Sequence, residues 1–208
     1  MSYALYVTHP QVIIDPDVPV PQWHLSETGR ARAEAFARHP LLQGVRRIIS
    51  SRETKALELA AILSATSGAP IESGHEFGEN DRSATGYLAG DAFEATADAF
   101  FAEPEVSVRG WETARAAQRR VVAAVNTALD HANELPIAFA GHGAVGTLLK
   151  CHLARRAIDR REDQRRIGDP GGGNVLVIRL ADRTLLSDWI PMERLPAALD
   201  ELPPLARS

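Results

Sequence analysis

Two histidines follow hydrophobic runs that lie far apart in the chain. His9 comes directly after the run at residues 3–7, and His142 comes shortly after the run at residues 137–140. Each run is typical of a short buried strand, and a helical pattern follows the second. In open parallel α/β sheets, ligands bind at the carboxyl ends of the strands. Imidazole can act as nucleophile, acid or base, or as a cation when protonated, so the two histidines predict a shared chemical site.

Positive and small residues occur at the ends of the same predicted strands. Arg52 and Lys55 follow a strand expected at residues 46–50, and Gly143 opens the helix after His142. Helix N-termini present free N–H groups and the positive end of a dipole, which suits an anion. Arg52, Lys55 and a protonated His142 would add positive charge. The sequence therefore predicts a site for a small anion, with phosphate as the leading candidate.

A polar, glycine-rich loop at residues 74–91 supplies the candidate acids. If a leaving group must be protonated, Glu79 in the segment FGENDRSATG is the first candidate and Glu76 the second. A simple solvated loop remains the alternative for these carboxylates.

Strand and helix patterns alternate along the chain, which favours a three-layer α/β/α sandwich with a mostly parallel central sheet. Strands are expected at 46–50 and 69–73 in addition to the two above, and residues 174–190 read as two strands joined by a turn at 181–183. Helices are expected at 27–39, 51–68, 91–103, 111–134 and 145–154. The charged run at 155–166 is interpreted as a solvated helix face or a subunit contact, and residues 171–173 as a turn into the next strand.

Composition limits the classes of function. A chain of 208 residues with 45% hydrophobic and 24% charged residues is expected to form a single domain over residues 1–208. A net charge of −4 favours neither nucleic acid nor an acidic membrane as a partner. Neither a secretory signal nor a membrane-spanning run is visible, and the single cysteine, Cys151, fits a cytoplasmic protein. The remaining histidines lack metal-ligand spacing, so we expect no metal and no cofactor.

Five short motifs, in order, resemble those of the histidine phosphatase superfamily, the phosphoglycerate mutase-like proteins. The family's Arg-His-Gly strand end corresponds to Thr8-His9-Pro10, and its next helix start to LSETGRARA. Its Ser-Ser/Pro-x-x-Arg-Ala segment corresponds to SSRETKALELA, its Gly-Glu-Ser to residues 110–112, and its second histidine motif to residues 141–143. Single motifs of this kind are weak, but five in the expected order over residues 3–180 are specific.

The resemblance implies a mechanism and assigns roles. His9 would be the nucleophile that takes the phosphoryl group, Glu79 the proton donor to the leaving group, and His142 an imidazolium that binds phosphoryl oxygens. Family members need no metal for this chemistry. A short lid would lie after the third strand, at about residues 74–110.

The sequence departs from the family pattern at three positions in one pocket. Thr8 and Lys55 replace two arginines, and Pro10 replaces a glycine and removes a backbone donor. Arginine binds phosphate through two parallel donors, whereas lysine is a point charge and threonine a neutral donor. The loss of one charge-assisted contact, worth ~1.5–3 kcal/mol, would weaken phosphate binding roughly 10- to 150-fold. Arg52 and Arg82 are the candidates to compensate.

Three functions stay open at this point. The leading one is a metal-independent phosphatase that hydrolyses a phosphomonoester or phosphoramidate through a phosphohistidine, with weakened activity as one possibility. The second is a non-catalytic sensor or scaffold that binds a phosphorylated ligand. A sugar-phosphate mutase is less favoured, because a short lid excludes water poorly. The partner would be a small phosphorylated molecule or a phosphoprotein, with a homodimer as an open alternative.

Overall fold

A central mixed sheet organises the protein. The computed structural model describes residues 2–130, 136–203 and 205. Within them, seven strands form one sheet in the order β3-β2-β4-β1-β5-β6, with β7 paired to β5. The strands are β1 (Tyr3–Thr8), β2 (Arg47–Ser51), β3 (Ile71–Gly74), β4 (Ile137–Gly141), β5 (Asn174–Arg179), β6 (Thr184–Leu185) and β7 (Ile190–Pro191). The first four strands of this order run parallel, and β5 to β7 join antiparallel.

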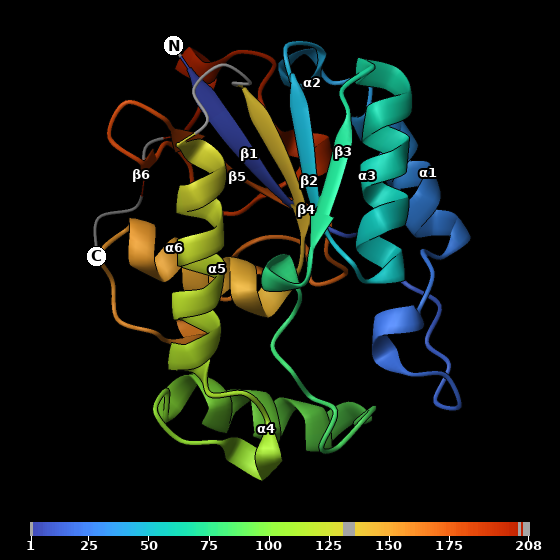
Figure 1. Cartoon of the computed structure of the whole chain (residues 1–208), viewed down its shortest axis with the longest axis vertical. Coiled ribbons are helices and arrows are strands. Elements are labelled where there is room, and N and C mark those ends of the chain that lie inside the picture. Colours follow the sequence, from blue (N-terminus) through green and yellow to red (C-terminus); the bar gives the residue numbers. More distant parts are fainter. Residues whose placement is uncertain (1, 131–135, 204, 206–208) are drawn as a thin grey trace.

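Helices cover both faces of the sheet, as the sequence predicted (Figure 1). The helices are α1 (Glu27–Phe36), α2 (Pro40–Gln43), α3 (Thr54–Ser67), α4 (Gly90–Ala102), α5 (Ala114–Leu129), α6 (Gly143–Leu153) and α7 (Gln164–Ile167). The side chains of β1 alternate between two cores, because successive residues of a strand point to opposite faces. Leu5 and Val7 pack with α1 and α3, whereas Ala4 and Tyr6 pack with α5 and α6. The α/β/α layers are therefore confirmed.

Several helices begin at a side-chain cap. The Ser26 hydroxyl accepts a hydrogen bond from the Gly29 amide at the start of α1, and the Thr113 hydroxyl accepts one from Ala116 at the start of α5. The cap at Thr113 explains why α5 begins at Ala114 rather than at residue 111 as predicted. Residues 131–134, the end of the helix predicted at 111–134, lie outside the described part of the chain, and His131 is among them.

The segment after β3 crosses the carboxyl ends of the parallel strands. It contains α4, which lies below the sheet in Figure 1, beyond the ends toward which the parallel strands point. Phe100, Phe101 and Trp111 are buried against the α5–α6 side of the core. This segment therefore lies where the predicted lid was expected.

The structure corrects two sequence expectations. The second C-terminal strand is broken into β6 and β7, because the Ser187 hydroxyl accepts the Val177 N–H (3.0 Å) that a continuous partner strand would bind. The charged run at 155–166 is not one solvated helix face: it folds as a 3₁₀ turn (Arg160–Glu162) followed by the short α7. The glycines at 171–173 do form the predicted turn into β5.

Candidate active site

The two histidines meet at the carboxyl edge of the sheet. Thr8 pairs with Gly141 across the parallel strands β1 and β4, and the His9 amide donates to the Gly141 carbonyl (3.0 Å). The rings of His9 and His142 lie with centroids 5.3 Å apart at an interplanar angle of 71°. The predicted meeting of the two imidazoles is therefore confirmed.

Glycines and a carbonyl hold His9 in place. The Gly173 amide donates to the His9 carbonyl (3.1 Å), and a Cβ on Gly172, whose φ is +78°, would lie 2.3 Å from that carbonyl oxygen. The His9 Nδ1 lies 2.9 Å from the Pro10 carbonyl oxygen. Because a carbonyl can only accept, Nδ1 carries the proton and the neutral ring has its lone pair on Nε2. Burial, together with His142 and Lys55, lowers the pKa of His9 to about 3.

His142 is fully buried beside it. Its Nε2 lies 2.7 Å from the Ser51 hydroxyl oxygen and 3.4 Å from a carboxylate oxygen of Glu53. Its Nδ1 is buried without a hydrogen-bond partner among the residues that the structure describes. Burial lowers the pKa of His142, although Glu53 and Glu79 act in the opposite direction. Burial therefore disfavours the imidazolium, and the role of His142 as an imidazolium that binds phosphoryl oxygens stays a prediction.

Glu79 is bound to the first turn of α6. Its carboxylate oxygens accept from the Ala144 (3.2 Å) and Val145 (3.0 Å) amides, and one of them pairs with Arg82 (2.9 Å). Burial opposes ionisation, but Arg82 and His142 outweigh it and hold the pKa of Glu79 below its usual value. The N-terminal amides of α6, which the sequence assigned to phosphate, thus bind a carboxylate of the protein itself.

Arg120 of α5 supports the loop that carries Glu79. Its guanidinium donates to the carbonyl oxygens of Glu76, Gly78 and Glu79, and it pairs with Glu112 (2.7 Å). Glu112 belongs to the motif at 110–112. Glu112 of this motif therefore supports the Glu79 loop indirectly, through its ion pair with Arg120.

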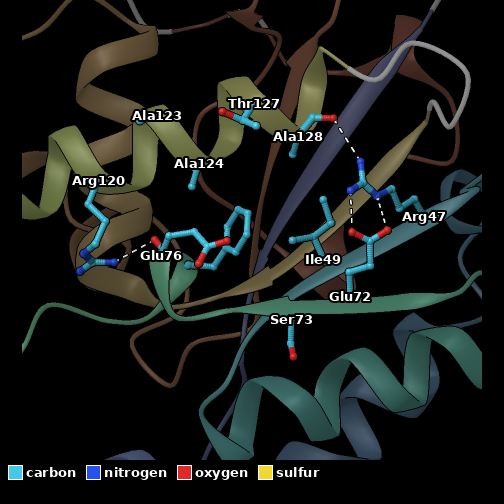
Figure 2. Close-up of a pocket in the computed structure, with 11 residues that line it drawn as sticks. Arg47, Ile49, Glu72, Ser73, Glu76, Arg120, Ala123, Ala124, Thr127 and Ala128 are labelled. Carbon is cyan, nitrogen blue, oxygen red and sulfur yellow. Dashed lines mark hydrogen bonds and ion pairs between the residues drawn. The ribbon is translucent and has the colours of Figure 1, made fainter.

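Glu76, the second candidate acid, lies elsewhere. It lines a separate hollow of about 490 Å³ between α5 and the β2–β3 edge of the sheet, together with Arg47 and Glu72 (Figure 2). None of the other predicted catalytic or phosphate-binding residues lines this hollow. The structure therefore separates Glu76 from the two histidines.

Lys55 is paired with a carboxylate that the sequence analysis missed. Its ammonium contacts Glu53 (2.5 Å) and donates to the Val20 carbonyl (2.8 Å), and only 4% of the residue is exposed. The other Glu53 oxygen accepts the Glu79 amide (2.8 Å). Glu53 thus contacts Lys55, His142 and Glu79. Its place two residues before Lys55, at the N-cap of α3, is the only sequence signal that could have indicated it.

One pocket of about 950 Å³ collects most of the predicted residues. Its lining includes His9, Arg52, Lys55, Glu79, Arg82 and Gly143. The lining also includes Arg160, Asp163, Gln164 and Arg165 from the segment that was interpreted as a solvated face. The run is therefore not solvated throughout: Asp163 and Gln164 are buried, whereas Arg161, Arg165 and Arg166 are exposed.

Thr8 is not part of the pocket lining. Its side chain is fully buried, and its hydroxyl donates to the Gln164 side-chain oxygen (2.7 Å) and accepts from the Asn174 amide (2.9 Å). The hydroxyl proton is therefore already used within the protein. Direct binding of phosphate by Thr8 stays a prediction, and this geometry does not favour it.

The model of the histidine phosphatase superfamily (branch 1) matches residues 15–186. This match covers most of the chain and begins after His9. The protein therefore belongs to the histidine phosphatase superfamily, branch 1. No match to a curated protein was found.

Solved structures share the fold. YhfR from Bacillus stearothermophilus is 20% identical, with a TM-score of 0.71 over 89% of this chain and 94% of that one. A mycobacterial glucosyl-3-phosphoglycerate phosphatase, solved in complex with inorganic phosphate, is 16% identical, with a TM-score of 0.66 over 89% and 94%. At these identities the similarity shows a common phosphoglycerate mutase-like fold.

In the described ranges, no group of three or more His, Cys, Asp or Glu side chains is placed to hold a metal ion. No helix in the same ranges is long and apolar enough to cross a membrane.

Proposed function

We propose that the protein is a metal-independent phosphatase that forms a phosphohistidine at His9. The observation that carries the proposal is the state of His9: its Nδ1–H is bound to the Pro10 carbonyl, its lowered pKa leaves the ring neutral, and it lines the pocket. A neutral imidazole with a free Nε2 lone pair is a nucleophile. Its ring lies 5.3 Å from that of His142, so the two imidazoles are close enough to act on one phosphoryl group, although His142 itself is fully buried.

In the first step, His9 Nε2 attacks phosphorus. The bond from phosphorus to the leaving oxygen breaks, and its electron pair stays on that oxygen, which takes up a proton. In the second step, water attacks the phosphohistidine, the P–N bond breaks, and the electron pair returns to Nε2. Inorganic phosphate is released, and a base accepts the proton of the water.

His142 and Lys55 are proposed to bind the phosphoryl oxygens. A buried Nδ1 without a hydrogen-bond partner costs free energy, and we propose that a phosphoryl oxygen satisfies it. The negative charge of the ligand raises the pKa of His142 and favours the imidazolium. Lys55 contributes a point charge that its ion pair with Glu53 partly neutralises.

Glu79 is the proposed proton donor. Its carboxylate is bound to the first turn of α6 and to Arg82, and its lowered pKa favours the ionised form. An arriving phosphate brings negative charge close to this carboxylate, which raises its pKa and favours the protonated form that can donate. Glu79 would then accept the proton of the water in the second step.

The outer pocket suggests the kind of leaving group. The walls of the pocket include the apolar or aromatic side chains of Pro19, Val20, Trp23, Tyr87 and Phe93. The Trp23 and Tyr87 rings are in edge-to-face contact, with their centroids 5.4 Å apart. These walls favour phosphomonoesters of aromatic or apolar alcohols over those of small polyols, because only the former bury apolar area here.

The alternative is a non-catalytic protein that binds a phosphorylated ligand. It is favoured by the ion pairs that Lys55 forms with Glu53 and Glu79 forms with Arg82. Both proposals share the phosphate site and differ only at the chemical step.

Hydrolysis of p-nitrophenyl phosphate and of glycerol phosphate separates the two. The phosphatase proposal expects turnover without added metal, a higher kcat/KM for the aryl ester, and loss of turnover in His9→Gln. His24→Gln is the matched control, because its partly exposed ring pairs with Glu58 outside the pocket. Binding of phosphate without any turnover of either ester would instead support the non-catalytic protein.

A further inference from the structure

We propose that Gln164 donates a hydrogen bond to the phosphoryl group. It would replace the arginine that the family has at the position of Thr8. Thr8 then acts as a positioning residue behind it. This inference rests on the proposed function, because it assumes that phosphate binds beside His9.

Two hydrogen bonds determine which way the Gln164 amide points. The Thr8 hydroxyl (2.7 Å) and the Asn174 side-chain amide (2.8 Å) both donate to the Gln164 Oε1. Only the oxygen of a carboxamide can accept two donors, so its NH₂ group faces the other way. That nitrogen has no hydrogen-bond partner in the part of the chain that the structure describes, although Gln164 is only 8% exposed.

The free NH₂ group faces the phosphate side of the pocket. A Cβ on Gly143 would lie 2.2 Å from the Gln164 Nε2, so the amide packs directly against the residue after His142. Its oxygen binds Thr8, the residue before His9. The side chain therefore lies between the two histidine loops, and it lines the same pocket as His9 and Gly143.

The backbone that carries Gln164 is fixed on both sides. The Asp163 carboxylate caps α7 by accepting the Arg165 amide (2.9 Å) and pairs with Arg160 (3.2 Å). Arg160 in turn pairs with Glu94 of α4 (2.7 Å). An unpartnered donor on a rigid backbone needs no reorganisation to bind an oxygen anion.

This arrangement explains how the pocket accommodates the change from arginine to threonine. A neutral N–H to a phosphoryl oxygen is a charge-assisted hydrogen bond, although it lacks the second donor and the charge of arginine. The family's charged group is thus replaced by a pair, in which Thr8 orients the amide and Gln164 supplies the donor.

Binding of inorganic phosphate, measured by calorimetry, and inhibition by vanadate test the assignment. Gln164→Ala should weaken both by about tenfold or more, because one charge-assisted hydrogen bond is lost. Gln164→Glu should weaken them further, since its carboxylate would face the anion. The matched control is Gln118→Glu: Gln118 is equally buried (7%) in α5 outside the pocket, so this variant should lower Tm without changing the phosphate affinity.

Thr8→Val tests the positioning role. It removes the hydroxyl that orients the amide, and should weaken phosphate binding severalfold in the wild-type background but have no effect in Gln164→Ala. Equal effects of Thr8→Val in the two backgrounds would overturn the positioning role.

The outcomes distinguish this inference from the proposed function. An unchanged phosphate affinity in folded Gln164→Ala and Gln164→Glu, with His9-dependent turnover in the wild type, would overturn the inference alone. Affinity that depends on Gln164, without turnover, would support the inference and overturn the phosphatase. A wild-type protein that binds neither phosphate nor vanadate would overturn both.

Discussion

Glu53→Gln is expected to destabilise the protein strongly while improving anion binding. The substitution keeps the shape of the side chain but removes the charge that lies 2.5 Å from the Lys55 ammonium. Lys55 is 4% exposed, so it would become an unpaired buried cation. Removal of one partner of a buried pair costs about 3–5 kcal/mol. For a chain of this size, that corresponds to a decrease in Tm of roughly 6–20 °C.

Thermal and urea unfolding at pH 7 measure this effect. Lys55→Met in the Glu53→Gln background should recover much of the loss, because it removes the unpaired charge. Glu105→Gln is the control for an exposed pair, since Glu105 is 68% exposed opposite Arg115 and should cost less than about 1 kcal/mol. Vanadate should inhibit Glu53→Gln more strongly than wild type, because a negative charge has left the pocket. A loss below about 1 kcal/mol in Glu53→Gln, or no recovery with Lys55→Met, would refute this account of the pair.

Three further predictions concern the histidine loops. Thr8→Arg should lower the unfolding free energy by about 1–3 kcal/mol, because Gln164 fills the space that the larger side chain needs. Vanadate should inhibit this variant no more strongly than it inhibits the wild type, and stronger inhibition would contradict the prediction. Gly172→Ala should lower kcat by about tenfold or more and lower Tm, since its Cβ would displace the His9 carbonyl; wild-type kinetics would argue against it. The unfolding free energy should decrease from pH 7 to pH 5. Folding lowers the pKa values of His9 and His142, so the unfolded chain takes up protons below about pH 6.5 that the folded protein does not. Urea titrations should show a smaller dependence of the unfolding free energy on pH in His9→Gln, and an unchanged dependence would count against the lowered pKa of His9.

The layered fold was predictable because local hydrophobic patterns in the sequence indicate its strands and helices. The hydrophobic runs before His9 and His142 are strands buried on both faces, and such runs are visible in the sequence. The meeting of the two histidines followed from one general rule about parallel sheets, which needs no knowledge of side-chain contacts.

The polar contacts of the site were not predictable in the same way. Gln164 binds Thr8 across 156 positions of the chain, and no local pattern indicates a contact at that separation. The run at 155–166 looked solvated because its charges alternate in sign. Arg160 and Arg165 of this run instead pair with Glu94 of α4, which lies more than sixty positions away.

The protonation state of Glu79 was also not predictable from the sequence. Its place in a polar loop suggested a free acid, but its state depends on α6 and Arg82, which fold against it. The sequence therefore indicated which residues meet more reliably than it indicated their protonation.

The central claim is that His9 becomes phosphorylated, and the most direct measurement is a single-turnover labelling experiment. Brief exposure to a phosphomonoester labelled in its phosphoryl group should leave label on His9, located by peptide mapping. The bond should be labile in acid and stable in base, because it is a phosphoramidate. Glu79→Gln should slow labelling by an alkyl phosphate more than by an aryl phosphate, whose leaving group needs little protonation. The absence of label at His9, in a protein that binds phosphate, would contradict the account.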